Sequence, residues 1–356
     1  MAIQKLTPKE FLNLANQHLV LDVRSPGEFL CGHIPNAQNL PLFSNDERKI
    51  VGTAYKQVSK QEAIKIGLDF FGIKMRTIVQ TVEEITNSAG LKIPLNTQDK
   101  HTVLVHCWRG GMRSAGVAWL LDLYGFNVCT LIGGYKAYRN WVINQFAFKY
   151  NFKLIGGFTG SGKTLLLKAL NEQKNTAIDL EALANHKGSA LGALGQAPQP
   201  SQEMFENLLA KNLSLIKSFT ENEVIFLEDE SQRIGNLQIP NPIWLQMRQS
   251  KVYFFNIPFG ERLDYLNQEY GKHSKDELTN AIIRIQKRLG GMETKNAINH
   301  LVENDTKECF RILLTYYDKW YKKGVQKREN AHTLITEIIS GEVNTKTNLT
   351  LLQNLL

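Results

Sequence analysis

The sequence predicts an α/β protein built from two domains. Short runs of β-branched residues and leucine recur along the 356-residue chain, and segments with apolar side chains at helical spacing separate them. Two glycine-rich loops each follow directly on one of these apolar runs. Such alternation is typical of parallel sheets, because a crossover helix has to connect consecutive parallel strands. The length and a composition of 43% hydrophobic and 21% charged residues suit two packed cores.

The first domain is expected to span residues 1–148. Apolar residues repeat at helical spacing over 114–124, and a second helix is predicted at 135–148. A mostly helical insertion is expected near residues 43–98, and no chemistry is assigned to it. Buried parallel strands are predicted for three short apolar runs, at residues 19–24, 101–106 and 128–132.

The second domain, residues 149–356, is expected to contain a doubly wound parallel sheet with a helical C-terminal part. Ligands of such sheets bind at the carboxyl ends of the strands. The helical part is expected at about 261–339, whereas the tail from Val343 has a weak pattern. Strands are predicted at residues 152–155, 176–179, 224–227 and 252–257, with helices near 165–170 and 202–219.

The composition indicates which kind of partner the protein binds and in which cellular compartment we expect it. The formal net charge is +8, and the excess of basic residues lies mostly in the first domain, which favours an anionic partner. No apolar run has the length of a membrane span and no signal peptide is evident, so we expect a soluble, cytoplasmic protein with no membrane partner. Four cysteines without a Cys-x-x-Cys pair predict neither a disulfide framework nor a zinc site: Cys31, Cys107, Cys129 and Cys309.

A reactive cysteine is predicted at Cys107, between the strand at 101–106 and a helix that begins near Arg113. A thiolate forms readily where backbone N–H groups, a helix N-terminus and a guanidinium surround it. Gly110 and Gly111 allow the loop to curl tightly, and Arg113 can bind two oxygens of a tetrahedral anion at once. The spacing His-Cys-x5-Arg-Ser is also that of cysteine phosphatases.

Residues around this loop are expected to support it. Asp22 and Arg24, at the end of an earlier strand, are expected to brace the loop rather than to react. His106 is either an acid–base group or a satisfied hydrogen-bonding residue, and Arg109 is a further catalytic candidate. The other supporting positions are Trp108, Gly110, Gly111, Met112 and Ser114.

A phosphate-binding loop, or P-loop, is predicted at residues 157–164. The pattern Gly-x4-Gly-Lys-Thr follows a predicted strand and opens a helix, which is the context that a P-loop requires. Backbone N–H groups would cradle a diphosphate and Lys163 would neutralise it. Any ligand with a pyrophosphate group satisfies this loop, so nucleotide hydrolysis does not follow from it. The predicted diphosphate-binding residues are Gly157, Thr159, Gly160, Ser161, Gly162, Lys163 and Thr164.

Acidic residues are expected beside the P-loop, as partners of Mg²⁺ or as a general base. Asp179 ends one predicted strand, and Glu228 and Asp229 end another. The sequence alone does not choose between them, and it assigns no metal ion. A Mg²⁺ ion that took part would be held by the Thr164 hydroxyl together with Asp179 or Asp229.

The N-terminal motifs resemble the rhodanese sulfurtransferase domain. They are DVRSPGEF at residues 22–29, GHIPNA at 32–37 and NLP at 39–41. The loop of Cys107 is one residue longer than the loop of simple sulfurtransferases. It resembles in this respect the phosphate-sized loop of the dual-specificity phosphatases that share the rhodanese fold.

The chain resembles tRNA 2-selenouridine synthases from its N-terminus to about residue 325. The resemblance implies a rhodanese-like α/β domain followed by a P-loop NTPase-like domain with a helical C-terminal extension. It rests on five strings in this order: CWRGGMRS at 107–114, GGYKAYR at 133–139, GFTGSGKT at 157–164, DLEALANHKGS at 179–189 and EDES at 228–231.

The resemblance implies a transferase that converts 2-thiouridine to 2-selenouridine at the wobble position of tRNAs for lysine, glutamate and glutamine. Geranyl diphosphate would first S-geranylate the base, and selenophosphate would then donate selenium, both as co-substrates rather than as tightly bound cofactors. Selenophosphate synthase is the implied protein partner. The P-loop would hold the prenyl diphosphate, Arg113 the selenophosphate oxygens, and Cys107 would lie near the selenium, with a covalent intermediate left open.

A tRNA substrate requires basic and aromatic contacts. Trp108 either stacks on the extruded wobble base or packs within the protein. The candidates for backbone contacts are Lys136, Arg139, Arg262, Arg288, Lys322 and Lys323.

Two other functional classes fit parts of the pattern. A rhodanese-fold cysteine phosphatase or sulfurtransferase fused to a P-loop kinase or ATPase would, as a phosphatase, release phosphate from a phosphomonoester through Cys107. A nonenzymatic binding switch is disfavoured, because the loop residues Cys107, Arg113, Lys163 and Thr164 are all intact.

Overall fold

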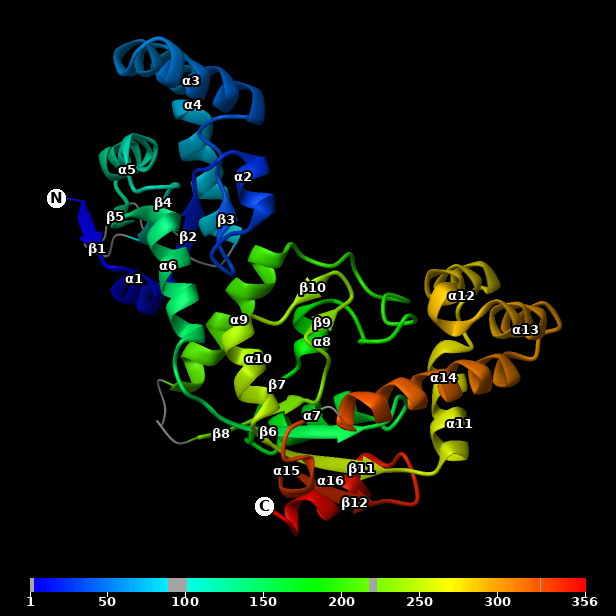
Figure 1. The fold of residues 1–356 in the computed structure, drawn as a ribbon. Helices are drawn as coiled ribbons and strands as arrows, with labels where there is room; N and C mark the ends of the chain where they lie inside the picture. The colour runs from blue at the N-terminus through cyan, green and yellow to red at the C-terminus, as the bar shows by residue number, and fades with distance from the viewer. Residues whose placement is uncertain (1–2, 89–100, 218–222, 327) are drawn as a thin grey trace. The chain divides into compact units, whose positions relative to one another are not determined.

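The computed structural model describes residues 3–88, 101–217, 223–326 and 328–356 (Figure 1). The chain divides into two compact units, residues 1–144 (unit 1) and 145–356 (unit 2). The division falls inside helix α6 (Gly134–Phe146), close to the junction expected after residue 148. None of the helices in the described ranges combines the length and the apolar character that a bilayer span requires.

Unit 1 contains a parallel sheet of five strands in the order β1-β5-β4-β2-β3. The three inner strands lie where the apolar runs predicted them, whereas the two edge strands are too short to give a sequence signal. Asp22 and His106 are paired at the ends of β2 and β4, so the segments that follow them leave the same edge of the sheet. The strands are β1 (Gln4–Leu6), β2 (Leu19–Asp22), β3 (Gln38–Asn39), β4 (Thr102–His106) and β5 (Asn127–Leu131).

The helical insertion expected near residues 43–98 is a pair of helices, α3 and α4, and its residues 89–98 lie outside the described residues. Phe71 and Val82 of α4 are buried in one core with Val103 of β4 and Val117 of α5, so the pair is an integral part of unit 1. The helices of this unit besides α6 are α1 (Pro8–Ala15), α2 (Pro26–Cys31), α3 (Asn45–Gln57), α4 (Lys60–Ser88) and α5 (Met112–Tyr124).

Unit 2 contains a second five-stranded parallel sheet, in the order β12-β11-β6-β8-β7, as expected for a doubly wound fold. The edge strand β12 corrects the prediction that this part of the chain is helical. A strand of five residues in which only Ile338 is buried carries too little periodicity to be recognised. The strands are β6 (Asn151–Gly157), β7 (Thr176–Ile178), β8 (Val224–Glu228), β11 (Lys251–Asn256) and β12 (Ile335–Ile339).

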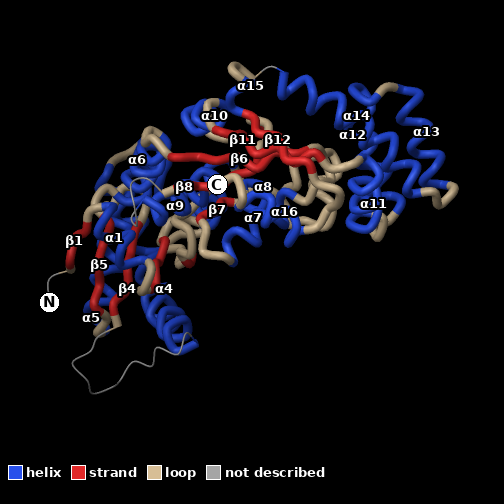
Figure 2. Tube along the Cα trace, turned by 90° about the horizontal axis from the view of Figure 1, so that it is seen from below, coloured by secondary structure: helices blue, strands red, loops and turns tan. Residues whose placement is uncertain are grey.

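The first four helices after β11 form a helical lobe with its own core. Leu263, Leu278, Leu301 and Phe310 are buried together there. Figure 2 shows these helices gathered beyond one end of the sheet. The lobe consists of α11 (Phe259–Tyr270), α12 (Lys275–Leu289), α13 (Gly291–Val302) and α14 (Thr306–Gln326).

The tail also folds, since Leu349 and Leu352 of α16 share a core with Leu166 of α7. The remaining elements of unit 2 are α7 (Lys163–Glu172), α8 (Leu180–Leu183), α9 (Gln202–Lys217), α10 (Asn241–Arg248), α15 (Ala331–Leu334), α16 (Thr345–Gln353) and the antiparallel pair β9 (Arg233–Ile234) and β10 (Leu237–Gln238).

Candidate functional site

The cysteine loop connects β4 to α5. Cys107 is buried, and its Sγ lies 3.2 Å from Oγ of Ser114, which itself donates a hydrogen bond to the Gly111 carbonyl at 3.1 Å. Gly110 has φ +62°, and a Cβ at this position would lie 2.6 Å from the Leu131 carbonyl oxygen. The loop therefore requires glycine where the sequence predicted a tight curl.

The first turn of α6 supports the cysteine loop through backbone hydrogen bonds. Its Tyr135 N–H donates to the Cys107 carbonyl at 2.8 Å, and the Lys136 N–H donates to the Trp108 carbonyl at 2.9 Å. Gly134 has φ +59°, and a Cβ there would collide with the backbone of Gly110 and Cys107. This close backbone contact explains the glycine at position 134 in the string GGYKAYR. The sequence alone did not indicate this role.

Asp22 and Arg24 are fully buried next to this arrangement. Nη2 of Arg24 donates to Oδ2 of Asp22 at 2.6 Å and to the Gly32 carbonyl at 2.7 Å. The guanidinium also lies 3.8 Å from the centre of the Tyr135 ring. This buried ion pair connects the end of β2 to the helix that supports the loop.

His106 is a packing residue and not an exposed acid–base group. The ring is fully buried, and among the described residues neither ring nitrogen has a hydrogen-bond partner, the nearest carboxylate oxygen being Oδ2 of Asp22 at 3.8 Å. Burial lowers the pKa of His106 and the nearby Asp22 charge only partly offsets this, so the ring is neutral. Trp108 is half-buried, with its ring 5.8 Å from the Tyr135 ring.

The guanidinium of Arg113 is bound to a carboxylate in this structure. Nη1 lies 2.7 Å from Oε2 of Glu28, and Nε of Arg48 lies 3.5 Å from the same oxygen. Burial by itself raises the pKa of Glu28, but Arg113 and Arg48 outweigh it and hold the pKa below its usual value. An anion that takes Arg113 therefore has to compete with Glu28. Arg109 and Met112 are exposed.

The P-loop connects β6 to α7 with three glycines at positive φ: Gly157 at +151°, Gly160 at +83° and Gly162 at +73°. Nζ of Lys163 donates to the Gly157 carbonyl at 3.0 Å, and Oγ of Ser161 donates to the Phe158 carbonyl at 2.5 Å. The expected strand–loop–helix context is present. It directs the N-terminus of α7 toward the carboxyl end of the sheet, where an anion is stabilised.

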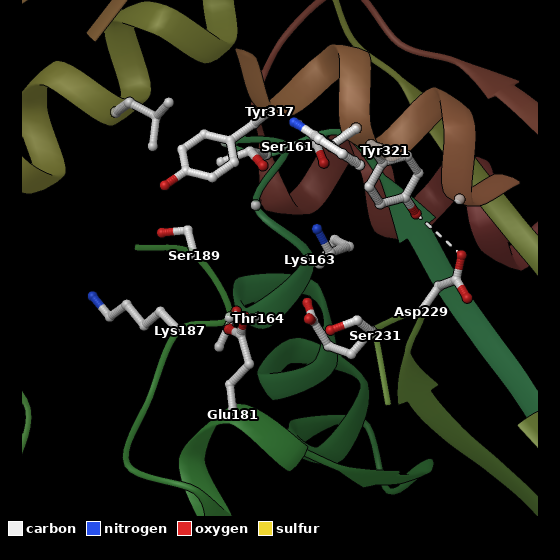
Figure 3. A pocket seen from close by; sticks show the side chains of 18 of the residues that line it. Ser161, Lys163, Thr164, Glu181, Lys187, Ser189, Asp229, Ser231, Tyr317 and Tyr321 are labelled. Atoms are coloured by element: carbon white, nitrogen blue, oxygen red, sulfur yellow. Dashed lines mark hydrogen bonds between the residues drawn. The ribbon is translucent and has the colours of Figure 1, made fainter. Parts of the chain in front are cut away.

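A cavity of about 710 Å³ opens at the P-loop (Figure 3). Its polar side is formed by Thr159 to Thr164 with Lys187, Ser189 and Ser231. Seven aromatic side chains also line it: Trp244 of α10 and, from the helical lobe, Tyr265, Tyr270, Tyr316, Tyr317, Trp320 and Tyr321. The Tyr321 hydroxyl accepts from the Gly157 N–H at 3.3 Å and donates to Oδ2 of Asp229 at 3.1 Å, so α14 is tied to the P-loop.

Of the three acidic candidates indicated by the sequence, Asp229 lines the P-loop cavity, whereas Asp179 and Glu228 do not. Asp179 does not line the cavity; it caps α8 by accepting from the Ala182 N–H at 2.7 Å. Asp229 lines the cavity, but Arg328 and Tyr321 bind its carboxylate. Glu228 is fully buried and accepts from the Leu180 N–H at 3.1 Å, and burial raises its pKa far above the usual range.

Glu181 and Glu230 occupy the expected acidic position instead. Oε2 of Glu181 accepts from the Thr164 hydroxyl at 3.1 Å, and both carboxyl groups line the cavity. Burial, followed by repulsion from Glu230, raises the pKa of Glu181 to about 8. Sequence reasoning missed both residues because it took the strand ends as the acidic positions; their presence in the strings at 179–189 and 228–231 was the available signal.

The set expected to hold Mg²⁺ is consequently not assembled. Thr164 faces Glu181, Asp179 lies elsewhere, and Asp229 is bound to Arg328. Within the described ranges, no cluster of three or more His, Cys, Asp or Glu side chains is placed to hold a metal ion.

The basic candidates for tRNA contact have different positions. Arg262 is wrong as a surface contact, because it is 3% exposed, is paired with Asp318 at 2.8 Å and donates to the Thr159 carbonyl at 3.1 Å. It supports the P-loop instead. Lys136, Arg288, Lys322 and Lys323 are exposed, and Arg139 is half-buried. Arg288 and Lys323 line a second cavity of about 490 Å³, together with Lys319 and the half-exposed Trp320.

Comparisons with known proteins agree with both units. The rhodanese-like domain family matches residues 7–140, and the tRNA 2-selenouridine synthase AAA domain family matches residues 150–345. The tRNA 2-selenouridine synthase of Hydrogenovibrio crunogenus is 33% identical over 87% of this chain and 90% of its own length. That of Bdellovibrio bacteriovorus is 31% identical, over 92% of this chain and 94% of its own. That of a Sulfurovum species is 33% identical, over 88% and 90%. The chain belongs to the tRNA 2-selenouridine synthase family.

Proposed function

We propose that this protein is a tRNA-modifying transferase that converts 2-thiouridine to 2-selenouridine at the wobble position of tRNAs for lysine, glutamate and glutamine. The proposal includes S-geranyl-2-thiouridine as intermediate, geranyl diphosphate as the first co-substrate and selenophosphate as the second. Relatives that carry the name tRNA 2-selenouridine synthase, aligned over both units, support the overall reaction.

The single observation that carries the geranyl step is the composition of the P-loop cavity. The lining offers loop N–H groups and Lys163 to a diphosphate, and it offers seven aromatic side chains to an apolar chain. Burying such a chain is favourable by about 25 cal/mol for each Å² of apolar surface removed from water. The sulfur of the base would displace the diphosphate from C1 of the geranyl group.

The cysteine loop is the proposed selenophosphate site. The loop and the N-terminus of α5 suit a tetrahedral anion, and Arg113 is the second residue of that helix. The selenium atom would add to C2 of the geranylated base, the geranyl thiolate would leave, and hydrolysis of the phosphorus–selenium bond would free phosphate. The Cys107 thiol would lie next to the selenium atom during this step. Selenophosphate synthase is the proposed source of this donor.

Exposed basic residues of the helical lobe are the proposed contacts to the tRNA backbone. Arg288, Lys319 and Lys323 surround the half-exposed Trp320 in the second cavity, with Nζ of Lys323 at 4.9 Å from the centre of its ring. Lysine and arginine neutralise phosphates, and an exposed aromatic ring offers a surface on which a base can stack. Lys136, Lys322 and Arg139 are further candidates.

The test is mass spectrometry of nucleosides from thiolated lysine tRNA, incubated with the purified protein and with geranyl diphosphate and selenophosphate, singly and together. Geranylated 2-thiouridine is expected with the first donor alone and 2-selenouridine with both. Unchanged nucleosides from well-folded protein would contradict the proposal. Release of phosphate from a phosphomonoester that depends on Cys107 would support instead a phosphatase fused to a P-loop kinase.

A further inference from the structure

Two arginines from different helices contact one carboxylate at the end of the cysteine loop. Nη1 of Arg113, in α5, lies 2.7 Å from Oε2 of Glu28, in α2, and Nη2 lies 3.3 Å from Oε1. Nε of Arg48, in α3, lies 3.5 Å from the same Oε2. Donors of both arginines are thus within reach of a single oxygen atom.

The contact with Glu28 leaves one donor of Arg48 without an acceptor. Nε of Arg48 is buried, and among the described residues it has no hydrogen-bond partner. Its separation of 3.5 Å from Oε2 is longer than a hydrogen bond in proteins. A buried polar atom without a partner is uncommon and needs an explanation. A small oxyanion bound between the two arginines would supply the missing acceptor.

Gly52 makes room for the Arg48 guanidinium. The two residues are four positions apart in α3, so they lie on the same face of the helix. A Cβ at Gly52 would collide with Nη1 of Arg48. Glycine weakens a helix interior relative to alanine. The position of the guanidinium therefore explains a glycine in the middle of α3.

The start of α3 is held against α2 independently of Arg48. The N–H of Gly27, in α2, donates to Oδ1 of Asn45, the first residue of α3, at 2.8 Å. A capping box fixes the first turn of α3, and Arg48 belongs to this turn. The fold of the helical insertion thus places Arg48 next to Glu28.

We propose that Arg48 is a second arginine of the anion site at the cysteine loop, and that Glu28 holds both guanidiniums until a tetrahedral oxyanion displaces its carboxylate. The inference rests on the proposed function, in which this anion is selenophosphate. An anion that replaces Glu28 at Nη1 of Arg113 comes within reach of Arg48, because both arginines approach the same point. Two guanidiniums suit an anion with more than one negative charge.

Glu28 is suited to this exchange. Burial raises the pKa of Glu28, but Arg113 and Arg48 outweigh it and hold the pKa below its usual value, so the carboxylate is charged at neutral pH. Its Oε2 also accepts from the Ser25 N–H at 3.2 Å, in the capping box of α2. The carboxylate therefore keeps a partner when the arginines leave it. Replacing one anion by another also avoids leaving a partly buried guanidinium unpaired.

The test is the KM for selenophosphate when the full-length protein selenates tRNA that has been geranylated beforehand. Arg48→Ala should raise this KM about tenfold, as expected for one charge-assisted hydrogen bond, with kcat within about threefold of wild type. Glu28→Gln should lower the KM about three- to tenfold, because the competing charge is lost. Lys49→Ala removes an exposed cation from the next position of α3 and is the matched control, with a wild-type KM expected.

Gly52→Ala separates a direct role of Arg48 from a loss of structure. The methyl group has to displace the guanidinium, whereas alanine stabilises the helix. The KM should therefore rise while the midpoint of denaturant unfolding stays the same or increases. An equal KM in Arg48→Ala and Lys49→Ala would overturn the assignment of Arg48. A raised KM in Glu28→Gln would overturn the competition, since Glu28 would then orient Arg113 for the anion.

Calorimetric binding of inorganic phosphate tests the site without the reaction. The measurement uses the Lys163→Ala background, in which the P-loop has lost its cation. Arg48→Ala should weaken phosphate binding about tenfold, and Glu28→Gln should strengthen it. This pattern in a protein that forms no 2-selenouridine would reject the proposed function alone, and the two arginines would then serve another oxyanion. Absent phosphate binding, or equal binding in all variants, would reject the inference.

Discussion

The cysteine loop of unit 1 and the P-loop of unit 2 both connect a buried strand to a helix, but different atoms hold them. Two backbone N–H groups at the start of α6, those of Tyr135 and Lys136, donate hydrogen bonds to carbonyl groups of the cysteine loop within the same unit. Side chains from distant segments, Tyr321 and Arg262, hold the P-loop. The cysteine loop forms a compact anion-binding site. The P-loop forms a similar site, and aromatic side chains of the helical lobe extend it. Loops with similar local signals can therefore serve ligands of very different size.

The largest effects should separate the two loops by their reactions. Cys107→Ala is expected to abolish selenation and to leave geranylation close to wild type, since Cys107 is not part of the P-loop cavity. Lys163→Ala should reduce geranylation by at least about 10²-fold, because a charge that stabilises the leaving group is lost. Nucleoside mass spectrometry measures both products. Lys163→Ala should still selenate tRNA that has been geranylated beforehand. If either variant lost geranylation and the selenation of geranylated tRNA to the same extent, the assignment of one reaction to each loop would be contradicted.

A large loss of stability is expected when the backbone contact between α6 and the cysteine loop is disturbed. Gly134→Ala places a methyl group against the backbone of Gly110 and Cys107 at a positive φ, and should destabilise unit 1 by about 2–4 kcal/mol. Denaturant unfolding of the whole protein measures this. Gly111→Ala is the matched control, because no atom lies within 4 Å of its Cβ and its φ is −100°. Equal stability of the two variants would contradict the backbone-contact explanation.

A pH effect should be confined to unit 2. The pKa of Glu181 is raised from 4.5 to about 8, so its contribution to stability is present below about pH 4.5 and is lost as the pH rises through about 8. Thermal unfolding should show wild type losing stability over this range relative to Glu181→Gln, by up to about 4–5 kcal/mol for a shift of this size. Parallel curves for the two proteins would show that Glu181 ionises at its ordinary pKa.

The smallest effect should come from the link between α14 and the P-loop. Tyr321→Phe removes the hydroxyl that accepts from Gly157 N–H and donates to Asp229, and a lost hydrogen bond of this kind is worth about 1 kcal/mol. Binding of geranyl diphosphate should weaken about three- to tenfold in calorimetry. Tyr55→Phe, at an exposed position in unit 1, serves as control. Unchanged binding in Tyr321→Phe would show that this contact does not set the loop.

The sequence predicted what is local and missed what is distant. The loops around Cys107 and Lys163 were recognisable because each places its glycines within a few residues of a strand end. The capture of Asp229 by Arg328 could not be predicted, since the two residues are 99 positions apart. The same holds for Arg113, which meets Glu28 across 85 positions. Side-chain partners at such separations depend on the packing of whole elements, which periodicity does not report.

The position of β12 has a consequence for the synthesis of the chain. β11 and β12 are neighbours in the sheet, yet the entire helical lobe lies between them in sequence. A growing chain therefore exposes the open edge of β11 until residue 339 has left the ribosome. Unpaired strand edges bind other chains readily, and pairing across so long a separation is slow. Unit 2 should depend on chaperones during translation more strongly than unit 1, whose sheet is complete by residue 131.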